Sequence, residues 1–289
     1  MAWRLGFYRG GRVFISPVSG IDIALWDLKG WRLGVPIHQL LGGKARHKLS
    51  VYAWIGGDRP SDVEAAGKEH LPRVLESSVE RLKTIKALGL NAARDFHGRL
   101  HKPMAKQLDK ALEPHRPLSL EEPLLSDLVS CPIALGERLC SRWDVKRFLG
   151  DASVDVLQPD FSNCGGVSEF HRIAAMAETY DVALASHCPL GHIALAVCMQ
   201  VDLATPNFAI HEMSLGIHYN KEAGEYDTTS YVKGLSVFDV KDGYVDALTR
   251  PGLGIEIDED VVRRLARSTE PWQPKELSSD RMVASGKDS

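Results

Sequence analysis

The sequence lacks the features that mark exported and membrane-spanning chains. No uninterrupted apolar run reaches the roughly 18 residues that a transmembrane helix requires. Residues 1–11 contain no apolar core of signal-peptide length. We therefore expect a protein that does not enter a membrane and that works in the cytoplasm.

The chain also has few cysteines and only a small net charge. The 35 basic and 38 acidic residues are mixed along the chain and leave a net charge of -3. Without a basic stripe to bind a phosphate backbone, nucleic acid is not expected as a partner. The number of cysteines is odd and their spacing includes no Cys-x-x-Cys pair, which favours a reduced, intracellular protein. They are Cys131, Cys140, Cys164, Cys188 and Cys198.

What the sequence does contain is the composition of an ordinary globular protein, with 44% hydrophobic and 25% charged residues. Near the N-terminus, Ile21, Leu25 and Leu28 recur at the spacing of a helix. Ser19 stands at the position of a helix cap, and Asp22 follows three residues later as its partner acid. We therefore predict a helix over residues 19–33.

A repeating pattern of strands and helices occupies the middle of the chain. A β-branched and aromatic run at 51–55 predicts a first strand. From residue 90 onward, short apolar runs that end in an acid or a histidine alternate with helical stretches. The later predicted strands cover 117–121, 132–137, 154–160, 182–187 and 208–212, and the predicted helices lie near 103–113, 142–149, 167–180 and 191–203.

This alternation predicts an α/β protein with a parallel sheet, because such strands pair through right-handed crossovers. A βα unit of roughly 25 residues repeated eight times makes a (β/α)8 barrel. All strands of a barrel end at one rim, so the polar residues at the strand ends would converge on a single site. An open doubly wound sheet is the structural alternative, and it would spread those residues along an edge.

Three predicted strand ends carry carboxylates: Asp95, Glu121 and Glu137. Three acids brought together repel one another unless a cation lies between them. Ligands that offer only oxygen select a hard ion, which favours Mg²⁺. The alternative is that each acid merely caps the following helix or pairs with an arginine such as Arg99 or Arg138.

Two histidines lie at the same predicted rim. His97 follows Asp95 by two residues, and His187 ends a strand. Asp160 ends the preceding strand and can lie beside His187, where a carboxylate fixes the imidazole tautomer and raises its basicity. A histidine base beside a Mg²⁺ site suits the removal of a weakly acidic proton next to a carboxylate. A second histidine can then protonate a leaving hydroxyl, and the two steps together make a β-elimination of water.

An ordered set of short motifs resembles the mandelate racemase branch of the enolase superfamily and, within it, the galactonate dehydratases. The resemblance covers most of residues 7–258. Asp-Phe-His-Gly-Arg at 95–99 and His-Cys-Pro-Leu-Gly at 187–191 are its most specific parts. The other motifs lie at 20–30, 35–43, 121–123, 136–138, 158–160, 211–220 and 251–254.

The resemblance implies a role for each candidate residue. It implies that the three carboxylates bind Mg²⁺ and that His187, paired with Asp160, abstracts the proton next to the substrate carboxylate. It also implies that His97 is the acid that expels the 3-hydroxyl. Glu212 would hydrogen-bond the substrate carboxylate or the enediolate. The implied substrate is an aldonic acid similar to galactonate, and the implied product is a 2-keto-3-deoxy acid.

Three departures from the family pattern predict an incomplete barrel. About 18 residues precede the helix predicted at 19–33, so most of the N-terminal α+β capping domain is expected to be missing. Residues 58–94 are too few for the second strand, its terminal lysine motif and the helices around it. The step of 16 residues from Glu121 to Glu137 is short for a parallel crossover. Either the barrel is broken there, or the chain crosses without a helix.

The resulting domain assignment has four parts. Other functions stay open beside the dehydratase: a non-catalytic homologue that binds acid sugars or a partner protein, and a racemase of the same branch. A homo-oligomer is also left open, because related enzymes often assemble. The four parts are a remnant of the capping region with the entry helix (1–50), the barrel (51–240), a closing segment (241–272) and a disordered tail (273–289).

Overall fold

The computed structural model describes residues 10–53, 71–98, 100–123, 130–189, 191–213 and 231–268. The tail expected at 273–289 and the residue Arg99 lie outside these ranges. Within them, no helix combines the length and the apolar composition needed to cross a membrane. All five cysteines are free and buried.

Seven short parallel strands form the centre of the molecule. Five of them pair in chain order: β2 (Arg94–Asp95), β3 (Leu120–Glu121), β4 (Ile133–Leu135), β5 (Val156–Leu157) and β6 (Ala183–Leu184). A parallel bridge from Leu184 to Phe208 connects β6 to the segment that leads into β7 (His211–Glu212). Strand β7 pairs in parallel with β1 (Lys48–Tyr52).

The parallel α/β class predicted from the sequence is therefore confirmed, whereas closure into a barrel is not observed in the described part of the chain. There, β1 and β2 are the two ends of the strand succession and do not pair with each other. Strand β1 is covered on its other edge by the antiparallel strand β9 (Tyr244–Asp246). A separate antiparallel pair joins β8 (Val232–Lys233) to β10 (Glu256–Ile257).

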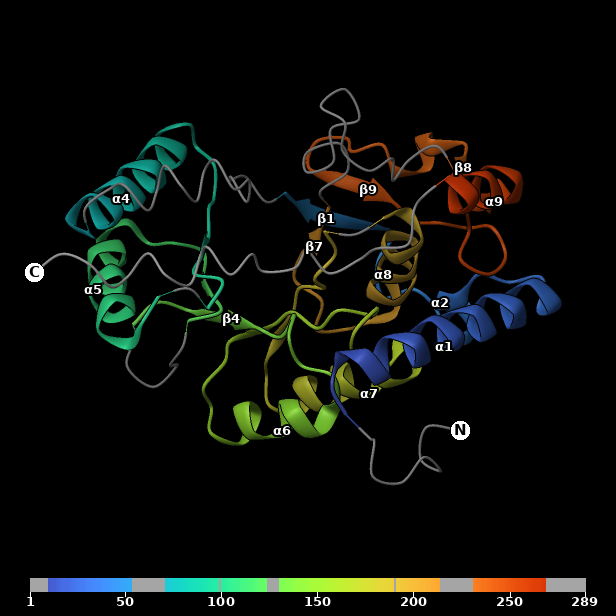
Figure 1. Ribbon diagram of the computed structural model, residues 1–289, viewed down its shortest axis with the longest axis horizontal. Helices are drawn as coiled ribbons and strands as arrows, with labels where there is room; N and C mark the ends of the chain where they lie inside the picture. Colours follow the sequence, from blue (N-terminus) through green and yellow to red (C-terminus); the bar gives the residue numbers. More distant parts are fainter. Residues whose placement is uncertain are drawn as a thin grey trace, which may run out of the picture.

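The helices between the strands lie where the apolar periodicity predicts them, within one or two residues. Helix α8 is apolar on nearly every side and is almost entirely buried, as expected for a helix packed between other elements. Figure 1 shows α8 beside β1, with α7 and α1 side by side below it. The crossover helices are α5 (Lys102–Leu112), α6 (Arg142–Gly150), α7 (Gly166–Thr179) and α8 (His192–Ala204).

Shorter or peripheral helices complete the described structure. Helix α4 (Leu71–Ala87) packs against α5 at one end of the molecule (Figure 1). The C-terminal helix α9 (Glu259–Ser268) follows β10. The remaining elements are α2 (Ile37–Leu40) and the 3-10 turns η3 (Glu113–His115) and η5 (Leu235–Phe238).

The entry helix α1 (Arg12–Leu33) begins earlier than the prediction of 19–33, and its N-cap is Gly11. Ser19 is therefore not a cap of its own helix. Its hydroxyl donates to Ile15 O and accepts from Gly165 N, at the start of α7. The predicted cap was wrong because the partner of Ser19 is distant in sequence, where a local pattern cannot reveal it.

The apolar stripe that indicates α1 is also not its buried face. Ile21, Leu25 and Leu28 are each more than half exposed, whereas Ser19 and Ile23 are buried. Periodicity identified the helix correctly, but it did not identify which side of the helix meets the core.

The short connection after β3 does not break the sheet. Strands β3 and β4 are parallel neighbours, with Leu120 opposite Ile133 and Glu121 opposite Ala134. The chain therefore makes a parallel crossover within residues 122–132, of which 124–129 lie outside the described residues. The sequence alternative of a barrel broken at this point is wrong.

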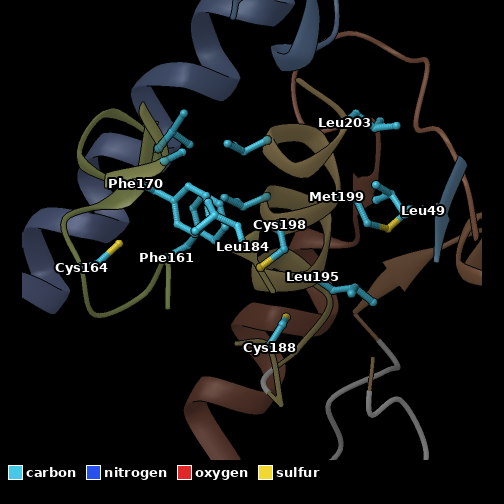
Figure 2. Close-up of a cluster of buried hydrophobic side chains, with 14 of the residues drawn as sticks. Leu49, Phe161, Cys164, Phe170, Leu184, Cys188, Leu195, Cys198, Met199 and Leu203 are labelled. Carbon is cyan, nitrogen blue, oxygen red and sulfur yellow. The ribbon is translucent and has the colours of Figure 1, made fainter. Parts of the chain in front are cut away.

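The buried apolar side chains form two separate clusters. The main core surrounds α7 and α8, where the rings of Phe161 and Phe170 stack with centroids 3.8 Å apart (Figure 2). A second, smaller cluster, here called the satellite core, lies between α4, α5 and the strands β2 and β3. It consists of Leu82, Phe96, Ala105, Leu108, Leu112, Leu120 and Cys131.

Candidate active site

The predicted site residues lie at or just beyond the carboxyl ends of consecutive parallel strands. Asp95 ends β2 and lies opposite Glu121, which ends β3. Glu137 follows β4 by two residues. Because parallel strands end at the same edge of a sheet, this topology brings the side chains to one side.

His187 lies between two carboxylates. Its Nδ1 is 2.9 Å from Asp160 Oδ2, and its Nε2 is 3.0 Å from Glu137 Oε2. Burial alone would lower the pKa of His187, but the hydrogen bonds to Asp160 and Glu137 outweigh it and raise the pKa to about 11. The other oxygen of Asp160 accepts a hydrogen bond from Ser162 N at 2.6 Å, which orients this carboxylate toward the imidazole. The predicted pairing of His187 with Asp160 is present in the structure.

His97 contacts the second oxygen of the same glutamate. Its Nε2 lies 3.6 Å from Glu137 Oε1, and its Nδ1 lies 3.4 Å from Asp95 Oδ2. The backbone N–H of His97 also donates to Asp95 Oδ1 at 2.6 Å. This tight turn places His97 at a positive φ of 51°, a conformation that side chains other than glycine seldom adopt.

Arg138 completes the contacts around Glu137. Its Nε donates to Glu137 Oε1 at 3.0 Å, and its guanidinium also donates to the carbonyl of His97 at 2.7 Å. Burial would raise the pKa of Glu137, but hydrogen bonds from His187 and Arg138 outweigh it and lower the pKa to about 2. Glu137 is therefore the carboxylate that joins the two candidate histidines.

A second group of acids, Asp95, Glu121 and Glu212, has raised pKa values. Burial, followed by the charges of Asp95 and Glu212, raises the pKa of Glu121 to about 8. Burial likewise raises the pKa of Asp95 and of Glu212. Glu212 is held by a hydrogen bond from Cys188 N to its Oε2 at 2.8 Å. The chemistry of these oxygen ligands fits a bound cation, which would relieve their mutual repulsion.

The geometry of a metal site, however, is not assembled in this arrangement. Within the described residues, no group of three or more His, Cys, Asp or Glu side chains is placed to hold a metal ion. Glu137 instead contacts His187, His97 and Arg138. Asp95, Glu121 and Glu137 therefore share one edge of the sheet and the right chemistry, but they do not converge on one point.

The structure adds two residues to which sequence analysis gave no role. Tyr52 ends β1 opposite Glu212. Burial, followed by the charges of Glu212 and Glu121, raises the pKa of its phenol well above the usual value. Gln158 Nε2 donates to the Tyr52 hydroxyl at 3.3 Å, while Gln158 Oε1 is buried and has no hydrogen-bond partner in the described part of the chain. The signal that could have identified both is their position at or just after the end of a strand.

Comparisons with known proteins identify the family of the chain. Residues 2–42 match the family described as the mandelate racemase/muconate lactonizing enzyme N-terminal domain, and residues 54–261 match the enolase C-terminal domain-like family. The D-galactonate dehydratase of Variovorax paradoxus (strain S110) is 43% identical over an alignment that covers 94% of this chain and 79% of that protein. The D-galactonate dehydratase of Ralstonia pickettii (strain 12J) is 44% identical with the same coverage.

Solved structures of the enolase superfamily are similar to this chain in fold. A superfamily member from Salmonella Typhimurium is 27% identical with a TM-score of 0.79, over 91% of this chain and 80% of that chain. An enolase from Agrobacterium radiobacter, described as a putative galactarate dehydratase with bound Na and L-malate, is 29% identical with a TM-score of 0.78. That match covers 93% of this chain and 78% of the other. The chain therefore belongs to the mandelate racemase/muconate lactonizing enzyme family of the enolase superfamily, an enzyme family in which its named relatives are hydro-lyases.

Proposed function

We propose that the chain dehydrates an aldonic acid similar to galactonate and yields a 2-keto-3-deoxy acid and water. The observation that carries the proposal is the position of His187. Its imidazole lies between Asp160 and Glu137, and His97 approaches the other oxygen of Glu137. Two groups that can transfer protons thus lie close together, and the elimination of water needs one group to take the α-proton and another to protonate the leaving hydroxyl. The relatives named D-galactonate dehydratases support the choice of substrate class.

The metal in this proposal is Mg²⁺, held by Asp95, Glu121 and Glu137. Bound there, a Mg²⁺ ion would polarise the substrate carboxylate and make its neighbouring proton more acidic. The support is the ligand chemistry: all three side chains offer oxygen, and the pKa values of Asp95 and Glu121 are raised. To act as a metal ligand, Glu137 must loosen its contacts with the two histidines.

In the first step, His187 accepts the proton of the carbon next to the substrate carboxylate. The carboxylate of Asp160 holds Nδ1 and thereby directs Nε2 toward the substrate. In the present arrangement Nε2 contacts Glu137, and the raised pKa keeps the imidazole protonated. Only after Glu137 releases Nε2 can His187 lose this proton and act as a base.

In the second step, the bond between the next carbon and its hydroxyl breaks. His97 donates a proton to that oxygen, which leaves as water, and the resulting enol rearranges to the 2-keto-3-deoxy acid. The partly exposed position of His97 suits this role, because about a third of its side chain is accessible to solvent. Glu212, held by the Cys188 N–H, hydrogen-bonds the substrate carboxylate or the enediolate.

The test is turnover of a panel of aldonic acids by the purified chain with Mg²⁺, with the 2-keto acid detected as its semicarbazone. His187→Gln is expected to lower kcat by at least about 1,000-fold, because the hydroxyl can leave only after His187 has removed the α-proton. His171→Gln is the matched control, since His171 is exposed on α7. It should leave kcat unchanged.

Two outcomes would contradict the dehydratase proposal. Folded wild-type protein that forms no keto acid from any aldonate would overturn it and favour a binding protein. Exchange of the α-proton in D₂O without loss of water would instead favour the racemase.

A further inference from the structure

A buried polar network lies next to the candidate site, on the side of the strands that faces α8. Asp202 on α8 is fully buried, and each of its carboxylate oxygens accepts one hydrogen bond. Ser186 Oγ donates to Oδ1 at 2.6 Å, and His211 Nδ1 lies 2.8 Å from Oδ2. Ser186 and His211 are also fully buried. A buried carboxylate is costly unless it is paired in this way, so the arrangement is energetically specific.

The partners of Asp202 immediately precede two candidate site residues in the chain. Ser186 precedes His187, and His211 precedes Glu212. Extended pairing continues through the first segment, because His187 N donates to Pro159 O at 3.3 Å. In extended chain, neighbouring side chains point to opposite faces. Fixing Ser186 and His211 on the helix side therefore fixes the direction of His187 and Glu212 on the other side.

The two segments are also connected directly. Glu212 N donates to Ser186 O at 3.4 Å, and Cys188 N donates to the Glu212 carboxylate at 2.8 Å. The end of α8 is anchored in turn by Arg46, whose guanidinium donates to the carbonyls of Asp202 and Thr205. The backbone of Asp202 is thus held in place, and its carboxylate has two hydrogen-bond partners, Ser186 and His211.

Asp202 is the group that orients His211. The other ring nitrogen of His211, Nε2, is buried and has no hydrogen-bond partner among the described residues. The ring direction therefore depends on the bond from Nδ1 to Asp202. A change at Asp202 would free the ring of His211 and the hydroxyl of Ser186 together.

We propose that Asp202 is a positioning residue: through Ser186 and His211 it sets the placement of His187 and Glu212. The inference rests on the dehydratase proposal for its catalytic consequence, but the placement itself can be measured without turnover. Partners in the layer behind functional groups commonly change activity by roughly 10- to 100-fold when they are removed.

The experiment compares Asp202→Asn with Gln200→Met. Gln200 is equally buried on the same helix, but it bonds to His38 and to the carbonyls of Leu248 and Leu253, away from the site. Both variants are expected to lower the melting temperature. Only Asp202→Asn should lower kcat per folded molecule, by roughly 10- to 100-fold. Its KM should change little, and the deuterium isotope effect for the α-proton should increase, because proton transfer to a misplaced His187 becomes slower.

The placement is read independently from the ring ¹⁵N and ¹H signals of His187 at a fixed pH, assigned with the His187→Gln variant. These signals should move in Asp202→Asn and stay in place in Gln200→Met. Equal losses of kcat in the two variants, or unmoved His187 signals in Asp202→Asn, would overturn the inference.

If the wild-type chain has no turnover, the dehydratase proposal fails. The ring signals alone then decide the inference: a shift in Asp202→Asn supports it, and unmoved signals overturn it. Should Asp202→Asn fail to fold, Ser186→Ala replaces it, because this variant removes only the bond beside His187 and leaves Asp202 paired with His211. It should move the His187 signals and lower any kcat severalfold, and unchanged values would overturn the inference.

Discussion

Glu121 is the site residue whose charge state is most unfavourable in the folded chain. Burial and the nearby charges of Asp95 and Glu212 raise its pKa to about 8, above the ordinary value of 4.5. Between those two pH values, the unfolded chain carries the carboxylate ionised while the folded chain keeps it protonated. The stability of the metal-free protein is therefore highest below this window and falls as the pH rises through it.

Replacing Glu121 by Gln removes this titration. We expect Glu121→Gln to stabilise the metal-free protein at about pH 8 by on the order of 1–3 kcal/mol, and to have little effect near pH 4.5. Thermal unfolding with EDTA measures the difference. Mg²⁺ should raise the melting temperature of the wild type but not that of the variant.

The control for this experiment is Glu178→Gln, at an exposed position of α7. It should change neither the pH dependence nor the effect of Mg²⁺. A Mg²⁺-induced increase in melting temperature that survives in Glu121→Gln would contradict the assignment of Glu121 as a ligand.

Single residues also show how far the sequence could predict the site. The pairing of His187 with Asp160 followed from their positions at consecutive strand ends, and the structure contains it. The contacts of Glu137 with both histidines could not be predicted, because they depend on side-chain directions that strand order does not determine. Tyr52 was missed for a similar reason: its phenol becomes notable only through the acids that surround it.

At the scale of elements, α1 supplies the polar groups that close the start of α7. Asp22 Oδ2 accepts from Ser168 N at 2.9 Å, and Oδ1 accepts from the Ser168 hydroxyl at 2.6 Å. The first N–H groups of a helix have no partner within the helix, and a negative charge there is favourable. Asp22 of α1 therefore caps the N-terminus of α7, where the N-cap residue of α7 itself supplies no side-chain hydrogen bond.

Asp22→Ala should therefore destabilise the protein by about 1–2 kcal/mol, the usual value of a helix cap. Urea unfolding followed by circular dichroism measures it. Asp22→Asn keeps the oxygen but loses the charge, so its loss should be smaller. Equal stability of Asp22→Ala and the wild type would mean that water replaces the cap at no cost.

Elements set by local spacing could be predicted from the sequence, whereas those set by distant contacts could not. The helices that follow β2, β4, β5 and β6 were placed within one or two residues, because their apolar spacing is a local property of the chain. The start of α1 was misplaced because Asp22 and Ser168 lie 146 residues apart. Of the two alternatives for the short step from β3 to β4, the broken barrel is wrong, because the register of Leu120 with Ile133 shows that the strands pair. The length rule behind that alternative is only a tendency.

The two hydrophobic clusters give the whole molecule an uneven distribution of stability. The satellite core is small, and β2 lies at the end of the strand succession in the described residues. Helix α8 lies in the large core and is buried along most of its length. Segments with fewer buried apolar contacts open locally at lower free energy.

We therefore expect amide hydrogens of α5 to exchange with free energies of opening about 2 kcal/mol or more below those of α8. Hydrogen–deuterium exchange with mass spectrometry measures both. Leu108→Ala in the satellite core should accelerate exchange in α5 and β2 and leave α8 unchanged. The exposed neighbour Gln107 provides the control, since Gln107→Ala should change neither helix. Equal protection of α5 and α8 would show that the two clusters open as one unit.

The pairing of β1 with strands far along the sequence affects folding during translation. Its parallel partner begins at His211 and its antiparallel partner includes Val245, so both neighbours are synthesised long after β1 has left the ribosome. Until then β1 exposes both of its edges, which are a template for pairing with other chains. Contacts so distant in sequence slow folding. We therefore expect β1 to stay unpaired during translation until its partners at 211–212 and 244–246 have emerged.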